Sequence, residues 1–126
     1  MSDPKRPPVL AALQEAAKGL LYVSETEAEL EPFVWDEKRD LTPERLVGLA
    51  GAAKGTAVEE APLDSFFRTI SSEDRPKFAK LATLFQKELI GTKVFKIGAE
   101  AEKLIYVVGR TKDGHWAGVS TVVVET

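Results

Sequence analysis

Residues 103–126 decide the fold, and they read KLIYVVGRTKDGHWAGVSTVVVET. Residues 104–108 and 116–124 are apolar runs rich in β-branched and aromatic side chains, and the polar loop between them ends in an Asp-Gly pair. Two such runs joined by a short turn-forming loop predict a β-hairpin. Neither run alternates between apolar and polar residues, which is typical of strands covered on both faces in a layered α/β domain. Because the chain ends with the second strand, we expect Glu125 and Thr126 at one edge of the sheet.

The residues before this hairpin predict further strands and helices. We expect strands at residues 33–35 and 94–97 and an extended segment at 20–23. Helices are expected between Pro8 and Gly19, between Thr42 and Gly51 and between Asp74 and Gly91, with a helical turn at residues 62–67 and loops at 24–31 and 52–60. Proline in the first turn and glycine after the last turn mark the helix limits. The fold class that follows is α/β, a four-stranded, mostly antiparallel sheet in a three-layer α/β/α sandwich, because buried strands need helices on both faces.

Length and composition restrict the class of protein. With 126 residues in all, we expect a single domain at residues 8–126, after a flexible, proline-rich arm at residues 1–7. No segment approaches the roughly 20 apolar residues of a membrane span and no signal peptide is recognisable, so we expect a cytoplasmic protein without a membrane partner. Cysteine is absent, which excludes disulfides and thiolate catalysis. The net charge of -3 is small and of the wrong sign for direct nucleic-acid binding.

An acidic segment lies at residues 24–40. It holds seven acidic and two basic residues, and thus a net charge of −5, while the whole chain has a charge of -3. The glutamates from Glu25 to Glu31 occupy every second position, so in an extended chain they would share one face at a spacing of about 7 Å. Carboxylates without a pocket that raises their pKa are not acid/base catalysts, and a solvated acidic loop is the ordinary interpretation.

The sequence offers little for catalysis or metal binding. His115 is the one histidine, and without cysteine it can form neither a zinc cluster nor a Cys-His nucleophile pair. We expect it to be a structural or solvated residue, and we expect Trp35 and Trp116 to be core residues rather than a ligand platform. The expectation is therefore a protein that is not an enzyme, without a cofactor and without a metal ion when isolated.

Short pieces of the chain together resemble a known family. They are Gly19-Leu20-Leu21-Tyr22, Ser24-Glu25, Phe33-Val34-Trp35, Asp64-Ser65-Phe66-Phe67, Ala117-Gly118-Val119-Ser120-Thr121 and Val123-Val124-Glu125-Thr126. In this order and spacing they are similar to the nuclease A inhibitor family, whose members block a sugar-non-specific, metal-dependent endonuclease. The resemblance runs from about Val9 to Thr126, and it implies an α/β/α sandwich.

The resemblance also implies a site. It implies that Glu25 ligates the catalytic metal of the nuclease and that Thr126 lies beside it. Supporting contacts to the nuclease are then expected from the neighbours of these two residues, Ser24, Thr26, Glu27 and Glu125. A carboxylate held on a loop can take the place of a phosphodiester oxygen on a hard cation, and it cannot be cleaved. The surrounding acids would meet the basic residues that normally grip DNA, and would speed association.

The chain departs from the family in two places. Glu29 and Glu31 make the acidic segment more charged, and residues 68–77 are short and lack an aromatic side chain that the family presents to its nuclease. Both departures bear on the affinity for any given nuclease.

The leading hypothesis is thus a nuclease inhibitor that is a monomer when free, and two other hypotheses stay open. A small-ligand-binding domain of the same fold that has lost its nuclease predicts a closed apolar pocket near Trp35 or Trp116. A hydrolase that uses Glu25 and Glu27 with a recruited metal predicts further ligands converging on one cleft.

Overall fold

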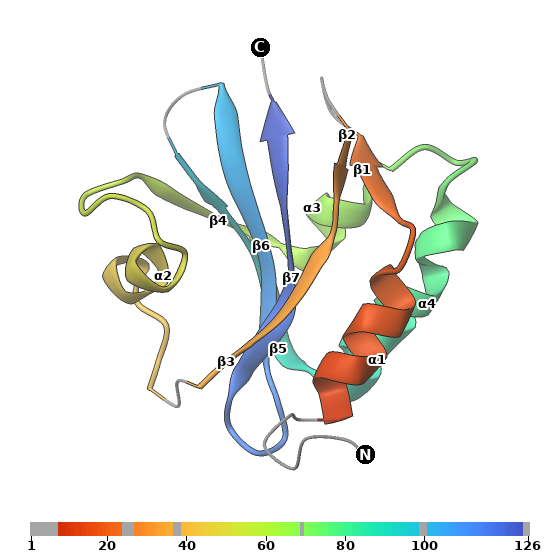
Figure 1. The fold of residues 1–126 in the computed structure, drawn as a ribbon, viewed down its shortest axis with the longest axis horizontal. Coiled ribbons are helices and arrows are strands. Elements are labelled where there is room, and N and C mark those ends of the chain that lie inside the picture. Colours follow the sequence, from red (N-terminus) through yellow and green to blue (C-terminus); the bar gives the residue numbers. More distant parts are fainter. Residues whose placement is uncertain (1–7, 24–26, 37–38, 69, 99–100, 125–126) are drawn as a thin grey trace.

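A five-stranded antiparallel sheet forms the centre of the molecule (Figure 1). The structure is a computed structural model, and it describes residues 8–23, 27–36, 39–68, 70–98 and 101–124. The sheet order is β3 (Glu31–Trp35), β7 (Trp116–Val124), β6 (Glu102–Arg110), β5 (Ile90–Ile97) and β4 (Val58–Pro62). As predicted, the last three strands of the chain are neighbours, and β6 and β7 form the hairpin.

The predicted sheet of four strands was wrong by one strand. Strand β4 lies within and just after residues 52–60, which were predicted as a loop, and it pairs with β5 from Val58↔Ile97 to Pro62↔Lys93. Its sequence, VEEAP, has one β-branched residue and two glutamates, so the pairing with β5 and not the local propensity makes it a strand. Charged residues and a terminal proline suit a strand at the edge of a sheet.

Helices lie on both sides of the sheet, but unequally (Figure 1). Helices α1 (Pro8–Ala17), α3 (Leu63–Arg68) and α4 (Arg75–Glu88) pack on one face over the larger hydrophobic cluster. The seven-residue helix α2 (Pro43–Leu49) covers part of the other face. The mixed α/β class is as predicted. Helices were expected to cover both faces of the β6–β7 hairpin, and they cover one face closely and the other only in part.

The register of the strands explains how one sheet serves two clusters. Successive side chains of a strand point to opposite faces. Val94 and Val107, which are cross-strand partners, belong to the larger cluster. The next pair, Phe95 and Tyr106, packs with α2 in the smaller one.

Local sequence signals set the helix starts. Thr42 caps α2, because its hydroxyl accepts a hydrogen bond from the Arg45 amide at 3.2 Å, and Pro43 follows in the first turn. Before α4, the Ser71 hydroxyl accepts a hydrogen bond from the amide of Asp74 at 3.3 Å. Both starts agree with the limits predicted from the sequence.

A second, two-stranded sheet lies beside the first. It consists of β1 (Leu21–Val23) and β2 (Glu27–Glu29). Residues 24–31 were predicted as a loop, so β2 corrects that prediction. Strand β2 also contacts β7, which lies inside the main sheet between β3 and β6. The expected position of Glu125 and Thr126 at an edge of the sheet falls outside the described residues. None of the described helices is long and apolar enough to cross a membrane.

Candidate functional site

The β1–β2 hairpin carries the segment for which the sequence predicts a function. Ser24, Glu25 and Thr26 connect the two strands, and they lie outside the described residues, as do Glu125 and Thr126. Of the predicted site residues the structure therefore places Glu27, which is exposed at the start of β2. Strands β1 and β2 flank residues 24–26 in the chain, and β7 precedes residues 125–126.

The inner face of the hairpin is anchored in the core. Its register pairs Tyr22 with Ala28, and Tyr22 is buried. The Tyr22 ring stacks on Phe66 of α3 with 4.5 Å between centroids and 11° between planes, and its hydroxyl donates a hydrogen bond to the Phe66 carbonyl at 3.1 Å. Leu20 and Leu30, on either side of the hairpin, are buried as well. The base of the 24–26 connection is thus fixed to the body of the protein.

The outer face of the hairpin is both apolar and acidic. Leu21 pairs with Glu29 and Val23 pairs with Glu27, so these four side chains share one face. Leu21 and Val23 are 42% and 52% exposed, and both glutamates are exposed. The face next to residues 24–26 therefore presents carboxylates and apolar surface side by side.

The acidic row continues from β2 into β3. Ala28 pairs with the buried Tyr22, and Leu30 is a buried member of the larger cluster, whereas Glu27, Glu29 and Glu31 alternate with them and are exposed. The pKa of Tyr106 is raised above its ordinary value, first by burial of the phenol and second by the negative charge of Glu31. The even spacing of glutamates read from the sequence is thus a row of exposed carboxylates in the structure.

The hairpin and the last strand reach the same end of the molecule. Strand β2 contacts β7, and in Figure 1 the β1–β2 hairpin and the C-terminal end of β7 lie toward the same end of the molecule. The two predicted site segments, residues 24–26 and 125–126, therefore both continue from this end of the fold.

Comparison with known proteins identifies the family. A family model described as nuclease A inhibitor-like protein matches residues 7–126, which is nearly the whole chain. The chain belongs to the nuclease A inhibitor-like family. No curated protein matches the sequence. The resemblance inferred from the short sequence pieces is confirmed.

In this nuclease A inhibitor-like chain both tryptophans are engaged in packing. The Trp35 ring lies 4.4 Å from Phe33 and 5.4 Å from Tyr106 between centroids, against the cluster under α2. Trp116 donates a hydrogen bond from Nε1 to the Arg39 carbonyl at 2.8 Å, and the Arg110 guanidinium lies 4.4 Å from its ring centroid. Both rings are partly buried, and Trp35 packs against the smaller cluster, whereas Trp116, which was also expected in the core, is a member of neither cluster.

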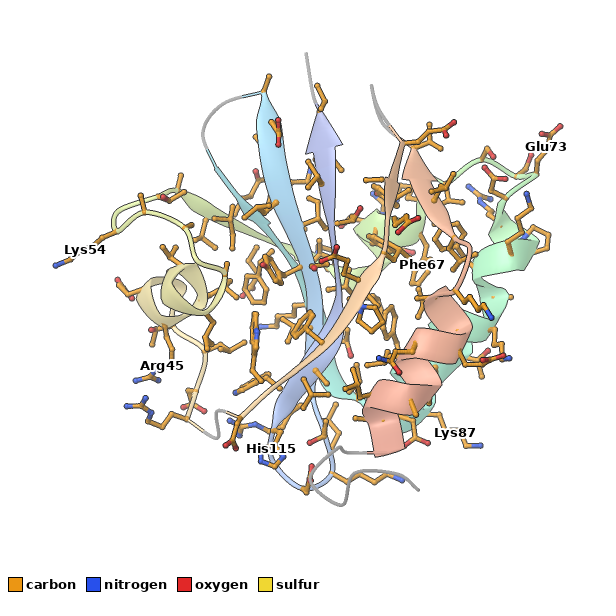
Figure 2. All side chains as sticks on the ribbon, viewed as in Figure 1. Arg45, Lys54, Phe67, Glu73, Lys87 and His115 are labelled. Carbon is orange, nitrogen blue, oxygen red and sulfur yellow. The ribbon has the colours of Figure 1, made fainter. Side chains whose placement is uncertain are left out.

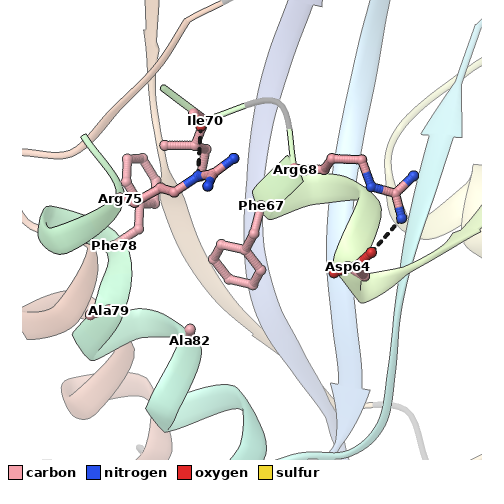
Figure 3. Close-up of a pocket in the computed structure, with 8 residues that line it drawn as sticks. All are labelled: Asp64, Phe67, Arg68, Ile70, Arg75, Phe78, Ala79 and Ala82. Carbon is pink, nitrogen blue, oxygen red and sulfur yellow. Dashed lines mark hydrogen bonds and ion pairs between the residues drawn. The ribbon is translucent and has the colours of Figure 1, made fainter. Parts of the chain in front are cut away.

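An apolar pocket of about 390 Å³ lies elsewhere, between α3 and α4 (Figure 3). Phe67, Phe78 and Ala82 contribute its apolar lining. At the pocket, Arg75 donates a hydrogen bond from Nε to the Ile70 carbonyl at 3.1 Å, and Arg68 pairs with Asp64 of the same helix. The apolar–polar pattern of residues 62–82 gave no sign of this pocket, because it forms only where the two helices meet.

His115 lies at the β6–β7 turn, at the opposite end of the molecule from the β1–β2 hairpin (Figure 2). Its Nε2 is 3.3 Å from Asp36 Oδ1 and its Nδ1 is 3.3 Å from Asp113 Oδ2. The pKa of Asp113 is lowered, first because the Thr111 hydroxyl donates a hydrogen bond to it and also because His115 lies near. Through these contacts His115 links the turn to Asp36, the residue after β3.

The hydrolase hypothesis needs several metal ligands on one cleft. Within the described ranges, no group of three or more histidine, aspartate or glutamate side chains is arranged to hold a metal ion. Of the pair that this hypothesis uses, Glu27 is described and Glu25 is not.

Proposed function

We propose that this protein blocks the active site of a sugar-non-specific, metal-dependent nuclease, with Glu25 as a ligand to the catalytic metal of that nuclease. Membership of the inhibitor family supports the role. The anchored hairpin is the single observation that supports the position, because Tyr22 and Phe66 fix the strands on either side of residues 24–26 to the body of the protein.

The chemistry of the contact follows from the metal. A hard divalent cation in a nuclease binds an oxygen of the scissile phosphodiester. A carboxylate supplies the same kind of oxygen and charge, but it has no bond that the nuclease can hydrolyse. The protein itself then binds without catalysing, and Ser24, Thr26, Glu27, Glu125 and Thr126 are proposed to support the contact around Glu25.

The exposed glutamate row contributes to the rate of association. Glu27, Glu29 and Glu31 are exposed, and exposed charges steer a partner of opposite sign more than they strengthen the final complex. The surface of a nuclease that grips nucleic acid is basic, which makes it the matching partner.

The test is the variant Glu25→Gln, which keeps the side-chain shape and removes the charge. Against a nuclease that the wild type inhibits, we expect the binding free energy calculated from the inhibition constant to weaken by about 2–5 kcal/mol, mainly through faster dissociation. Glu29→Gln and Glu31→Gln are the matched controls, and each should cost about 1 kcal/mol or less, mainly through slower association at low salt. Deletion of Thr126 should have an intermediate effect, because it also moves the terminal carboxylate.

The measurement compares these variants at two salt concentrations. If the three glutamate variants weaken inhibition equally and salt removes the differences, metal capture by Glu25 is wrong. DNA cleavage by the pure, metal-supplemented protein that Glu25→Gln abolishes would favour the hydrolase instead. A single domain at residues 8–126, a monomeric free state and a cytoplasmic location stay predictions beside this proposal.

A further inference from the structure

Exposed apolar side chains are concentrated on the hairpin. Leu21, Val23 and Ile90 are the large apolar side chains that the described part of the chain exposes, at 42%, 52% and 65%. Two of the three lie on the outer face of β1, directly before the 24–26 connection. Single exposed apolar residues are common on soluble proteins, whereas apolar side chains grouped at a binding site commonly mark a contact surface.

The charges beside these two side chains restrict what can cover them. Val23 pairs across the hairpin with Glu27, and Leu21 pairs with Glu29, so Cβ atoms in each pair are about 4.5–5.5 Å apart. Along each strand the spacing between like side chains is about 7 Å. The face is therefore an apolar row on β1 beside an acidic row on β2, and it repels an acidic partner.

We propose that Leu21 and Val23 form the apolar anchor of the contact with the nuclease, and that they pack on the apolar or aromatic wall of its nucleic-acid cleft while Glu27 and Glu29 meet its lysine and arginine side chains. Clefts that bind single-stranded nucleic acid combine a basic track for the phosphates with aromatic side chains on which the bases stack. The outer face of the hairpin carries the complement of both features in adjacent rows. This inference rests on the proposed function and deepens it by naming the surface of the partner.

The two rows act on different steps of binding. The exposed carboxylates raise the association rate through long-range attraction, which salt screens. The apolar pair slows dissociation, because its surface is removed from water only when the complex has formed. Charge removal and apolar truncation on the same hairpin should thus separate in the kinetics.

The experiment uses the full chain and a purified sugar-non-specific, Mg²⁺-dependent nuclease, taken from a panel because the wild type inhibits it. Leu21→Ser and Val23→Ser are made singly and together, and Ile90→Ser is the matched control. Ile90 is more exposed than either residue. It pairs with Arg110 at the end of β6 that leads into the β6–β7 turn, and so it does not lie on the β1–β2 hairpin. Circular dichroism and thermal unfolding confirm that each variant is folded.

We expect the double variant to dissociate about 10–100-fold faster, as for truncating anchor residues of an interface, with an association rate within about twofold of the wild type. Ile90→Ser should leave both rates unchanged. Glu27→Gln and Glu29→Gln should instead lower the association rate at low salt.

Three results would overturn the inference, and they are distinguishable from failure of the proposed function. If the double variant dissociates like the wild type while Glu25→Gln releases the nuclease, the inhibitor function stands and the apolar anchor is wrong. If Ile90→Ser has an equal effect, the change is not specific to the hairpin. If the wild type forms dimers in sedimentation that Val23→Ser abolishes, a second copy covers this face. If no nuclease of the panel is inhibited by the wild type, the proposed function itself fails.

Discussion

At the scale of single residues, Gly118 controls how closely β6 and β7 approach. It is the third residue of β7 and is buried. A Cβ atom added there would overlap the Val107 carbonyl oxygen and would lie 2.8 Å from the Val107 carbonyl carbon and 3.1 Å from the Val108 Cα. These are backbone atoms of the neighbouring strand, so they can give way only if the strand moves.

Gly118→Ala is therefore expected to destabilise the protein by about 1–3 kcal/mol, which is the usual cost of overpacking a core. Gly48→Ala is the matched control, because Gly48 is exposed in α2 and nothing lies within 4 Å of its added Cβ. Alanine there should stabilise the helix by about 0.5–1 kcal/mol. Denaturant unfolding of both variants measures the difference, and a neutral Gly118→Ala would show that the two strands are less closely packed than described.

At the scale of elements, strand β4 shows how pairing overrides local preference. Glu59 and Glu60 are poor strand residues, yet they pair with Lys96 and Phe95 of β5. Glu60 also lies 3.5 Å from Lys93 across the strands. An edge strand with charged side chains and a proline at its end resists pairing with the strands of other molecules. The same residues have a low strand propensity, which is why the sequence did not predict β4.

The β1–β2 hairpin depends on contacts with other elements. A two-stranded hairpin is at best marginally stable alone, and this one also borders a pocket of about 450 Å³ whose lining includes Tyr22, Val23 and Phe66. The buried Tyr22 hydroxyl and ring thus carry much of its attachment to α3. The position of strands β1 and β2 relative to the main sheet therefore depends on the contacts between Tyr22 and Phe66.

Tyr22→Phe should lower the free energy of local hairpin opening by about 1 kcal/mol, because it removes one buried hydrogen bond and keeps the stacked ring. Hydrogen exchange of the β1 and β2 amides measures this opening. Tyr106→Phe, a half-buried tyrosine in the main sheet, is the control and should leave the hairpin amides unchanged. Equal protection in both variants would mean that the hydroxyl of Tyr22 does not hold the hairpin.

At the scale of the whole molecule, the two faces of the sheet differ in how they are covered. Leu13, Leu81 and Phe85 of α1 and α4 are fully buried in the larger cluster. On the other face, Leu46 and Val47 of α2 and Ile97 of β5 are the buried members of the smaller cluster, and the aromatic residues around them are only partly buried. We therefore expect the α2 side to open more readily than the α1–α4 side.

Leu46→Ala and Leu81→Ala test this difference, because both leucines are almost completely buried. Each should cost about 2–5 kcal/mol of local or global stability. In native-state hydrogen exchange, Leu46→Ala should speed exchange chiefly in α2, whereas Leu81→Ala should speed it throughout α1, α4 and the central strands. A uniform effect of both variants would show that the molecule opens as one unit.

Much of the fold, and the family, follow from the sequence alone, whereas the site residues stay a prediction. The apolar runs that flank an Asp-Gly turn determined the β6–β7 hairpin, because their burial needs no information beyond the pattern. The caps and prolines determined the starts of α2 and α4, because those signals act within one turn. The short pieces from residue 19 to the chain end determined the family, which the match over residues 7–126 confirms.

Only the tertiary structure decided the rest. Strand β4 exists because β5 offers it hydrogen bonds, and β2 exists because Glu27–Glu29 pair with β1, and neither partner can be read from the local sequence. The unequal coverage of the sheet depends on where the short helix α2 packs. The sequence showed an even spacing of glutamates, but it took the register of the hairpin to place Leu21 and Val23 beside two of them, since cross-strand neighbours are set by pairing and not by distance along the chain.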